Sequence, residues 1–315
     1  MNGAPPAVQA RGLTKRFGAF VAVDALDLDI AKGEVVGFIG PNGAGKSTTI
    51  RMLCGLLRPS AGTATVAGYD IVREPETVRA HIGYMSQKFS LYGDLTVAEN
   101  LRFFGGLYRV PRAELKERMA FAVTMAGLTG REDALVRTLA GGWKQRLALG
   151  CAILHRPPVL FLDEPTSGVE PEARRRFWDL IHSLAADGVT ILVSTHYMDE
   201  AEYCNRIALI AAGHLIAIGS PGELKRRDLG GALVELESPQ PGAALAALHG
   251  APGVVEAAIF GDRLHVLLAP GTDAAALARF LVAHGLTATP PKPIIPSLED
   301  VFVRLVSRKP APEAA

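Results

Sequence analysis

The sequence predicts an α/β fold with a parallel sheet, and three observations lead to that class. Short apolar runs at 34–39 and 189–193 are typical of parallel strands, which are buried on both faces. Segments with helical apolar spacing, such as 171–186, alternate with these runs. A glycine-rich loop at 40–48 joins the first strand to a helix, which is the arrangement that cradles phosphate groups.

Length and composition limit the possible domain organisation, partners and location of the protein. The 315 residues suffice for a main domain and a small second one, and a hydrophobic content of 49% suits a folded core. A net charge of +1 gives no basic field, so we expect no nucleic acid partner. No apolar run approaches the length of a membrane span, and residues 1–10 lack the core of a signal peptide. Three scattered cysteines follow no metal spacing and indicate reduced thiols in a cytosolic protein.

The first 30 residues alternate in a strand-like way, with a turn at Gly18. Phe17 precedes that turn, and the residue type alone favours a place in the core over an exposed one.

The loop fits the phosphate-loop pattern, and a helix is expected over 46–57. Glycine allows close approach of backbone N–H groups to an anion, and the helix N-terminus adds its positive dipole end. Lys46 can reach the β- and γ-phosphates, and the Ser47 hydroxyl can ligate Mg²⁺. The candidate phosphate-binding residues are Gly40, Pro41, Asn42, Gly43, Ala44, Gly45, Lys46, Ser47 and Thr48.

Strands are expected at 63–66 and 82–85, the second followed by Gln87, which is uninformative alone. Residues 90–138 read as an inserted helical subdomain, and Thr96 with Glu99 forms a capping box at its first helix.

Two glycines then open a helix expected over 142–155, which makes a second, weaker anion site. The strand at 159–162 ends in Asp163 and Glu164, at the sheet edge where α/β proteins bind ligands. Asp163 is placed to hold Mg²⁺ through oxygen, and Glu164 to polarise a water. A strand-end acid pair that merely caps a loop is the alternative.

A helix is expected over 171–186, where the arginine run 174–176 reads as a solvated face. The next strand ends near His196, which taken singly is as consistent with a structural role as with a catalytic one. Residues 207–218 read as a hairpin about Gly213. Residues 231–305 predict a small α+β module of order β-α-β-β-α, with a last short helix from residue 296, and 306–315 predict a disordered tail.

In this order, the motifs resemble those of the ATP-binding subunit of an ABC transporter, over residues 7 to about 230. The phosphate loop resembles Walker A, and the strand ending at Asp163 resembles Walker B. Segments 83–87, 95–100, 196–202 and 296–302 are similar to those of ABC-2-type exporters, which include multidrug and daunorubicin-type resistance pumps. The implied fold is a P-loop NTPase of ABC type with a helical subdomain and a C-terminal module.

The resemblance also implies roles for residues. Phe17 would stack on adenine, which reverses the preference for core, and Glu164 would be the catalytic glutamate, with Lys46 and His196 also catalytic. Mg²⁺ would lie on Ser47 and Asp163, with Gln87 near it. Contacts to ATP across a head-to-tail dimer would come from the signature segment, Leu139, Ala140, Gly141 and Gly142.

The implied cofactors are ATP and Mg²⁺, and the implied partners are a second copy of the chain and a separate transmembrane permease. A coupling helix of that permease would enter a groove around Leu91, Tyr92 and Glu99, at the cytoplasmic face of the plasma membrane.

Three positions depart from the family pattern. Ala140 stands in place of the signature serine, Trp143 in place of a glutamine and Glu170 in place of the D-loop aspartate. We expect slower hydrolysis or looser dimer closure from these changes.

Other classes are kept as alternatives. A soluble ABC ATPase of translation or DNA repair usually has two cassettes or long coiled coils, and neither is present here. A P-loop kinase would lack the signature and the histidine, and a regulatory ATP-binding protein would lack a transport partner.

Overall fold

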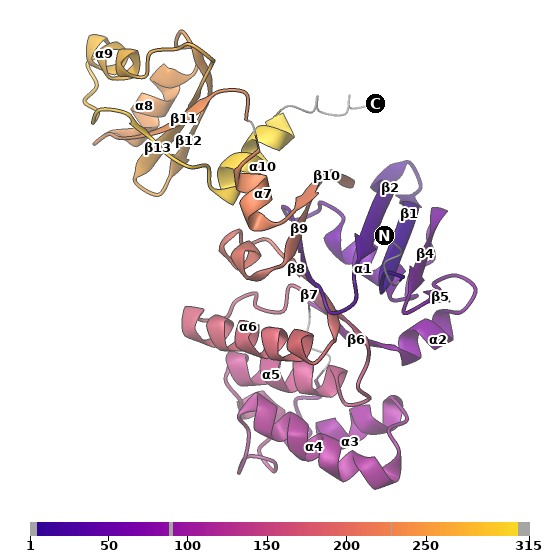
Figure 1. The fold of residues 1–315 in the computed structure, drawn as a ribbon. Coiled ribbons are helices and arrows are strands. Elements are labelled where there is room, and N and C mark those ends of the chain that lie inside the picture. The colour runs from indigo at the N-terminus through magenta and orange to yellow at the C-terminus, as the bar shows by residue number, and fades with distance from the viewer. Residues whose placement is uncertain (1–4, 88–90, 228, 308–315) are drawn as a thin grey trace. The chain divides into compact units, whose positions relative to one another are not determined.

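The computed structural model describes residues 5–87, 91–227 and 229–307. The chain divides into two compact units, Met1–Ile218 and Gly219–Ala315, each described here by itself (Figure 1). The boundary lies about a dozen residues before the one expected from composition.

The first unit contains two sheets and most of the helices. Its strands are β1 (Val8–Phe17), β2 (Phe20–Ile30), β3 (Val35–Ile39), β4 (Ala61–Val66), β5 (Tyr69–Asp70), β6 (Ile82–Met85), β7 (Val159–Asp163), β8 (Thr190–Thr195), β9 (Arg206–Ala211) and β10 (His214–Gly219), the last ending at the unit boundary. Its helices are α1 (Lys46–Leu53), α2 (Pro75–Ala80), α3 (Val97–Leu107), α4 (Arg112–Ala126), α5 (Gly141–Ala152) and α6 (Pro171–Ala186), with 3₁₀ turns η1 (Val136–Thr138) and η2 (Asp199–Tyr203).

The main sheet has the order β10-β9-β3-β8-β7-β6, and the strands from β9 to β6 run parallel. All five residues of β3 and of β7 are buried, as expected for strands covered on both faces. The register pairs Ile39 with Thr195 and Asp163 with Ser194. The carboxyl ends of β3, β7 and β8 therefore meet at one edge, directly before the phosphate loop and Glu164.

The second sheet, β2-β1-β4-β5, is antiparallel. The expected short strands of the first 30 residues prove to be two long ones, joined by a turn in which Gly18 has a φ of 58°. Continuous pairing across several register shifts allows this length, because bulges let a twisted strand stay paired.

The predicted helical insertion is present as α3 and α4, which pack with α5 around their own core of residues such as Leu101 and Leu147 (Figure 1). The capping box at Thr96 and Glu99 is confirmed. Asn100 is fully buried, and its side chain accepts from the N–H of Tyr92 and donates to the carbonyl oxygens of Tyr92 and Thr96. This one side chain fixes the loop that leads into α3.

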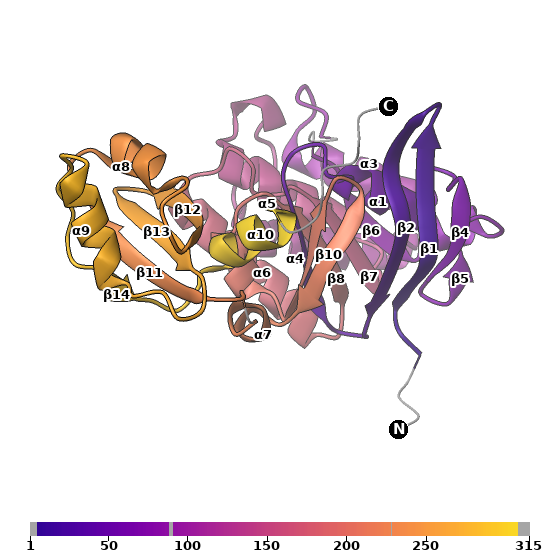
Figure 2. The ribbon, with the colours of Figure 1, turned by 90° about the horizontal axis from the view of Figure 1, so that it is seen from above.

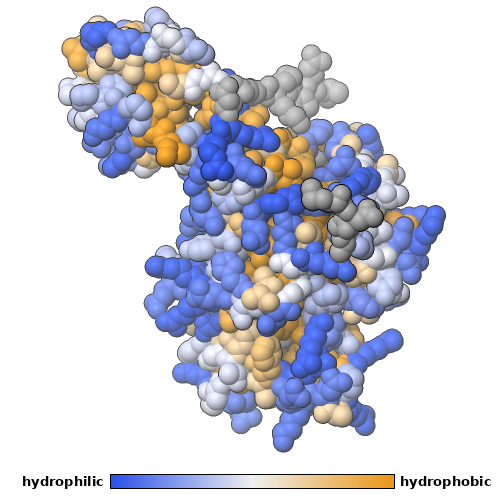
Figure 3. All heavy atoms as spheres, in the orientation of Figure 1, coloured by the Kyte–Doolittle hydropathy of each residue, from blue (hydrophilic) through white to orange (hydrophobic). Residues whose placement is uncertain are grey.

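The second unit begins with α7 (Pro221–Lys225), followed by β11 (Ala232–Glu237), α8 (Pro241–Leu248), β12 (Val254–Phe260), β13 (Arg263–Leu268), α9 (Ala275–Ala283), β14 (Lys292–Pro293) and α10 (Leu298–Ser307). Its sheet has the order β12-β13-β11-β14, with α8 and α9 on one face and α10 on the other (Figure 2). The expected elements are all present, and α7 and β14 are additions. In Figure 3, apolar side chains gather over part of this unit, where Val255 and Ile259 of β12 are among its exposed apolar residues.

Two further sequence expectations can be compared with the structure. The predicted disordered tail is wrong for residues 306 and 307, which belong to α10, and its remainder, 308–315, lies outside the described residues. Across the described ranges, no helix is both long enough and apolar enough to cross a membrane. The three cysteines are free and buried, and burial raises the pKa of the Cys204 thiol to about 12.

Candidate functional site

The phosphate loop is closed by glycines at positions where a side chain would not fit. A Cβ on Gly40 would lie 2.0 Å from the carbonyl oxygen of Ile210, and one on Gly45 would lie 2.5 Å from that of Ala22. Gly45 also has a φ of 105°, which L side chains rarely adopt. The loop therefore makes a tight turn between β3 and α1, and the N-terminus of α1 points toward the centre of this loop.

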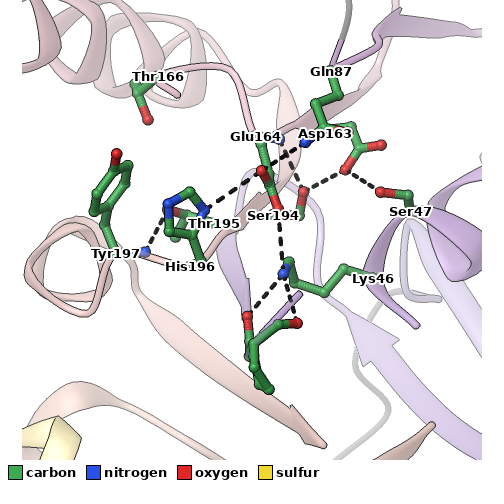
Figure 4. Close-up of polar contacts among 12 residues, drawn as sticks. Lys46, Ser47, Gln87, Asp163, Glu164, Thr166, Ser194, Thr195, His196 and Tyr197 are labelled. Atoms are coloured by element: carbon green, nitrogen blue, oxygen red, sulfur yellow. Dashed lines mark hydrogen bonds and ion pairs between the residues drawn. The ribbon is translucent and has the colours of Figure 1, made fainter. Parts of the chain in front are cut away.

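Lys46, the first residue of α1, is almost fully buried at 3% exposure. Its Nζ donates to the carbonyl oxygens of Gly40 at 2.8 Å and Pro41 at 3.1 Å. The same Nζ lies 3.3 Å from Oε1 of Glu164, as Figure 4 shows. The ammonium group is thus surrounded by oxygens, which satisfies a buried charge.

Asp163 ends β7, and its Oδ1 accepts two hydrogen bonds. One comes from Ser47 Oγ at 3.0 Å and the other from Ser194 Oγ at 2.7 Å. Burial, assisted by the Asp163 charge, raises the pKa of the nearby Cys54 thiol. A carboxylate beside a hydroxyl offers the oxygen ligands that Mg²⁺ prefers, and Mg²⁺ commonly takes only one or two protein ligands and completes its shell with phosphates and water. Because both ligand atoms are oxygens and lie 3.0 Å apart, they fit magnesium held together with a phosphate.

Glu164 is the centre of the arrangement and has a left-handed backbone, with a φ of 50°. Non-glycine residues adopt this region at a cost and are often found at functional sites. Its N–H donates to Ser194 Oγ at 3.0 Å, which holds the turn in place. Its Oε2 accepts from Gln87 Nε2 at 2.9 Å and lies 3.5 Å from His196 Nδ1 (Figure 4). The structure therefore brings Lys46, Gln87, Glu164 and His196 together.

Phe17 lies at the end of β1, and its side chain is 51% exposed. The interpretation as core, drawn from the residue type alone, is therefore wrong. Lys15 Nζ lies 5.1 Å from the centre of its ring, which leaves the aromatic surface presented to solvent beside a positive charge.

The signature segment opens α5 as expected, one residue earlier. Leu139 is buried, Ala140 is the N-cap, and Gly141 and Gly142 begin the helix. Ala140 has the extended backbone of a cap but no side-chain acceptor, so it leaves the first turn without a side-chain cap. Trp143 packs at the helical core with the Arg131 guanidinium 4.2 Å from its ring.

The backbone hydrogen bonds around these four residues remain local. The N–H of Leu139 donates to Val136, and the Ala140 carbonyl accepts from Trp143 and Lys144. Within the described residues, none of these bonds joins the segment to the cluster around Glu164.

Two contributions were not predicted. Ser194 joins Asp163 to the Glu164 backbone, and its position at the carboxyl end of the strand next to β7 was the signal available. Arg174, expected on a solvated face, is instead partly buried beside Asp199 and Tyr197, and the expectation is wrong for this residue.

Comparison with known proteins gives the family. The family model described as ABC transporter matches residues 23–167, and a model of an AAA domain matches 144–198. The "Daunorubicin resistance ATP-binding protein DrrA3" of Streptomyces coeruleorubidus is 38% identical over 310 residues, covering 96% of this chain and 96% of that protein. The chain belongs to the ATP-binding proteins of ABC transporters. This ABC protein is similar over 96% of its length, and so through most of its second unit, to a protein named for daunorubicin resistance.

Two further relatives match about two thirds of the chain. The "Probable multidrug ABC transporter ATP-binding protein YbhF" of Escherichia coli K12 is 50% identical over 218 residues, which cover 69% of this chain. The chain spans only 38% of the length of that relative. A solved dimeric ATP-binding cassette in a post-hydrolysis state, bound to ADP and phosphate, is 27% identical, with a TM-score of 0.62 over 68% of this chain and 98% of its own.

Proposed function

We propose that this protein is the ATP-hydrolysing motor subunit of an ABC-2-type exporter for drugs or other hydrophobic compounds. The observation that supports this function best is the convergence of three polar side chains, those of Lys46, Gln87 and His196, on the Glu164 carboxylate beside a phosphate loop. The names of its drug-resistance relatives support the cargo class.

ATP binding follows from the loop and its surroundings. Residues 40–48 wrap the phosphates with backbone N–H groups, and Lys46 exchanges its carbonyl and carboxylate partners for phosphate oxygens. Phe17 stacks on the adenine, for which an exposed ring next to a lysine is suited.

Hydrolysis depends on positioning and on charge neutralisation, as in other phosphoryl transfers. Glu164 accepts the proton of the attacking water, and the side-chain amide of Gln87, which donates from Nε2, orients its carboxylate. His196 holds the γ-phosphate from the adjacent strand end. Mg²⁺, held by Ser47 and Asp163 with Gln87 near it, would neutralise charge on the phosphates when bound.

A second copy of the chain completes each site in this proposal. Leu139, Ala140, Gly141 and Gly142 make their hydrogen bonds within their own segment, and the N–H groups of the first turn of α5 point out of that helix. ATP would join the phosphate loop of one copy to this helix start in the other. The dimeric cassette found among the structural relatives supports this arrangement.

A separate permease would dock on the first unit. A groove of about 750 Å³ lies between α1, α2 and the end of α3, and its lining includes Leu56, Tyr84, Leu107 and Tyr108. Leu107 is 61% exposed, which is unusual for leucine unless a partner covers it. Leu91 lines a smaller hollow that shares both tyrosines. We extend the docking surface predicted around Leu91, Tyr92 and Glu99 to this groove.

Such docking would place the protein on the cytoplasmic face of the plasma membrane. The proposal is tested by purifying the protein with and without its membrane partner and measuring Mg-ATP hydrolysis. The Glu164→Gln variant with ATP should elute as a dimer on size exclusion, while the same variant without ATP should elute as a monomer. A preparation that neither binds nor cleaves Mg-ATP contradicts the function, and a monomer at all concentrations contradicts the dimer.

A further inference from the structure

A second polar cluster surrounds a buried carboxylate that has no role in the hydrolysis proposed above. Glu200, in η2, is 1% exposed. Its Oε1 accepts from Thr166 Oγ1 at 2.6 Å, and Thr166 is equally buried. Burying a carboxylate costs several kcal/mol unless it is paired and hydrogen-bonded, so its retention here needs a reason.

The pairing of Glu200 is incomplete. Arg174 Nη1 lies 4.0 Å from Oε1, and within the described residues Glu200 Oε2 has no hydrogen-bond partner. The indole nitrogen of Trp178 and Nε of Arg174 are also buried without one. These groups line a cavity of about 260 Å³, roomy enough for ordered water. The single short bond of Glu200 is therefore the one to Thr166.

Thr166 belongs to the turn that carries Glu164. The N–H of Ser167 donates to the carbonyl of Glu164, and the N–H of Val169 donates to that of Thr166. A turn that begins with a left-handed residue returns to a more common backbone unless its surroundings hold it. Holding Thr166 therefore holds the backbone of Glu164.

Glu200 lies four residues after His196, on the same connection out of β8. Arg174 reinforces this connection, since its guanidinium lies 4.6 Å from the ring centre of Tyr197 and 3.5 Å from Asp199. The Thr166–Glu200 bond thus ties the segment after Glu164 to the segment after His196, in addition to the direct contact between Glu164 and His196.

We infer that Glu200 is a positioning residue. Through its hydrogen bond to Thr166, it keeps the Glu164 carboxylate and the His196 ring in their positions relative to each other. This inference rests on the proposed ATP hydrolysis. Loss of the Thr166–Glu200 bond lets the turn relax, so that turnover falls while the phosphate loop, which follows β3 and makes no contact with this bond, keeps its affinity for nucleotide.

The test uses the full chain and the threonine, because removing the buried carboxylate directly risks misfolding. Thr166→Val keeps the shape but deletes the hydroxyl, and Thr166→Ser keeps the hydroxyl. We expect kcat of the valine variant to fall about tenfold, the effect of one modest interaction on a barrier, with KM for Mg-ATP within about twofold of wild type. Serine should restore at least half of the wild-type rate.

Thr190→Val is the matched control. Thr190 is also 1% exposed, and its hydroxyl accepts from the Gly33 N–H at the opposite end of β8. This variant should lower the melting temperature but leave kcat unchanged. A double-mutant cycle of Thr166→Val with Glu200→Gln should be strongly non-additive in kcat.

Two results overturn the inference. One is a Thr166→Val enzyme with wild-type kcat, and the other is a set of variants in which kcat falls only in step with melting temperature, Thr190→Val included. A wild-type protein without ATPase activity instead contradicts the proposed function, so the two failures are distinguishable.

Discussion

Lys46 Nζ lies 3.3 Å from Oε1 of Glu164, and both side chains are more than nine-tenths buried. A close pair of opposite charges in such a place is costly to break by removing one partner. The pair links the phosphate loop directly to the end of β7. In the mechanism proposed above, nucleotide phosphates compete with Glu164 for the lysine, and this competition frees the carboxylate to contact a water molecule.

The first prediction concerns that carboxylate. Glu164→Gln removes the proton acceptor, so turnover should fall at least about tenfold, since a general base typically contributes 10²–10⁴. The amide lacks the negative charge and competes less strongly with phosphate for Lys46, so affinity for ATP should be retained or increase. Steady-state hydrolysis and equilibrium nucleotide binding test both parts. Glu172→Gln, which changes an exposed glutamate of α6, should alter neither. Unchanged turnover of Glu164→Gln would remove the residue from the mechanism.

The second prediction concerns Phe17. If its exposed ring stacks on adenine, Phe17→Ala should weaken ATP binding about tenfold or more, because stacking of a base on an aromatic contributes roughly 1–3 kcal/mol. Phe17→Trp should retain the affinity. Phe20, its partner in the register of β1 and β2, is 63% exposed and gives the matched control in Phe20→Ala. Equal losses for both alanine variants would indicate a general effect on the hairpin.

The phosphate loop, the acid pair and Phe17 show which features of the site can be predicted from the sequence and which cannot. The phosphate loop and the acid pair were predicted because local patterns dictate them: a glycine pattern between a strand and a helix, and charges directly after an apolar run. Phe17 was misassigned from its type because exposure of an aromatic depends on strand pairing, which no local pattern records.

The role of Ser194 and the Thr166–Glu200 bond were not predicted from the sequence, for a related reason. Their partners are about 30 residues away and become neighbours only through the order of β7 and β8 in the sheet. The length of β1 and β2 depended on bulges, which a strict alternation of apolar residues cannot anticipate. Arg174 was wrongly predicted to lie on a solvated face. A run of arginines has the same sequence pattern whether or not a buried glutamate lies opposite one of them.

The third prediction concerns Ala140, the uncapped start of α5. Ala140→Ser should stabilise the first unit by about 1 kcal/mol, the usual difference between serine and alanine at an N-cap. Its hydroxyl should also tighten the ATP-dependent dimer at least about tenfold, because a hydrogen bond to a charged group contributes roughly 1.5–3 kcal/mol. Glycine is a better cap than alanine but offers no hydroxyl, so Ala140→Gly separates the two effects. Thermal unfolding measures the stability, and size exclusion with ATP measures the dimerisation. If the serine and glycine variants have the same stability and the same dimerisation, the contact between the hydroxyl and ATP is excluded.

The fourth prediction is a pH dependence of stability that arises from His155. Burial, with a smaller contribution from the Arg118 charge, lowers the pKa of His155 below 6.5, although its hydrogen bond to the Ile82 carbonyl opposes this. Its Nδ1 is buried and has no hydrogen-bond partner among the described residues, so a proton there would find no acceptor within them. Below pH 6.5 the unfolded chain binds a proton that the folded chain does not, so stability is lost as pH falls from 6.5 through the folded pKa.

Urea unfolding between pH 7.5 and 5 tests this sign. His155→Gln should flatten the slope by up to about one proton, because the amide can still donate to Ile82 but does not titrate. His249→Gln, which changes an exposed imidazole of the second unit, is the control. A slope that is the same in both variants would assign the acid sensitivity to other groups.

The last prediction concerns coupling to the membrane partner. Glu99 is exposed but also caps α3, since its carboxylate accepts from the Thr96 N–H at 2.8 Å, and this bond lowers its pKa. Charge reversal to lysine would remove both the negative charge and the cap. Glutamine keeps a capping box, so Glu99→Gln isolates the charge. In the intact transporter, Glu99→Gln should reduce drug transport more than basal ATP hydrolysis.

Leu107→Glu, which places a charge in the apolar groove, should do the same more strongly, because a buried unpaired charge at an interface costs several kcal/mol. In the isolated protein neither variant should change hydrolysis, since both positions lie outside the Glu164 cluster. The exposed Phe121 of α4 lies outside that groove, and Phe121→Glu is the matched control. Transport and hydrolysis that decline in parallel for Leu107→Glu would place the permease elsewhere on the first unit.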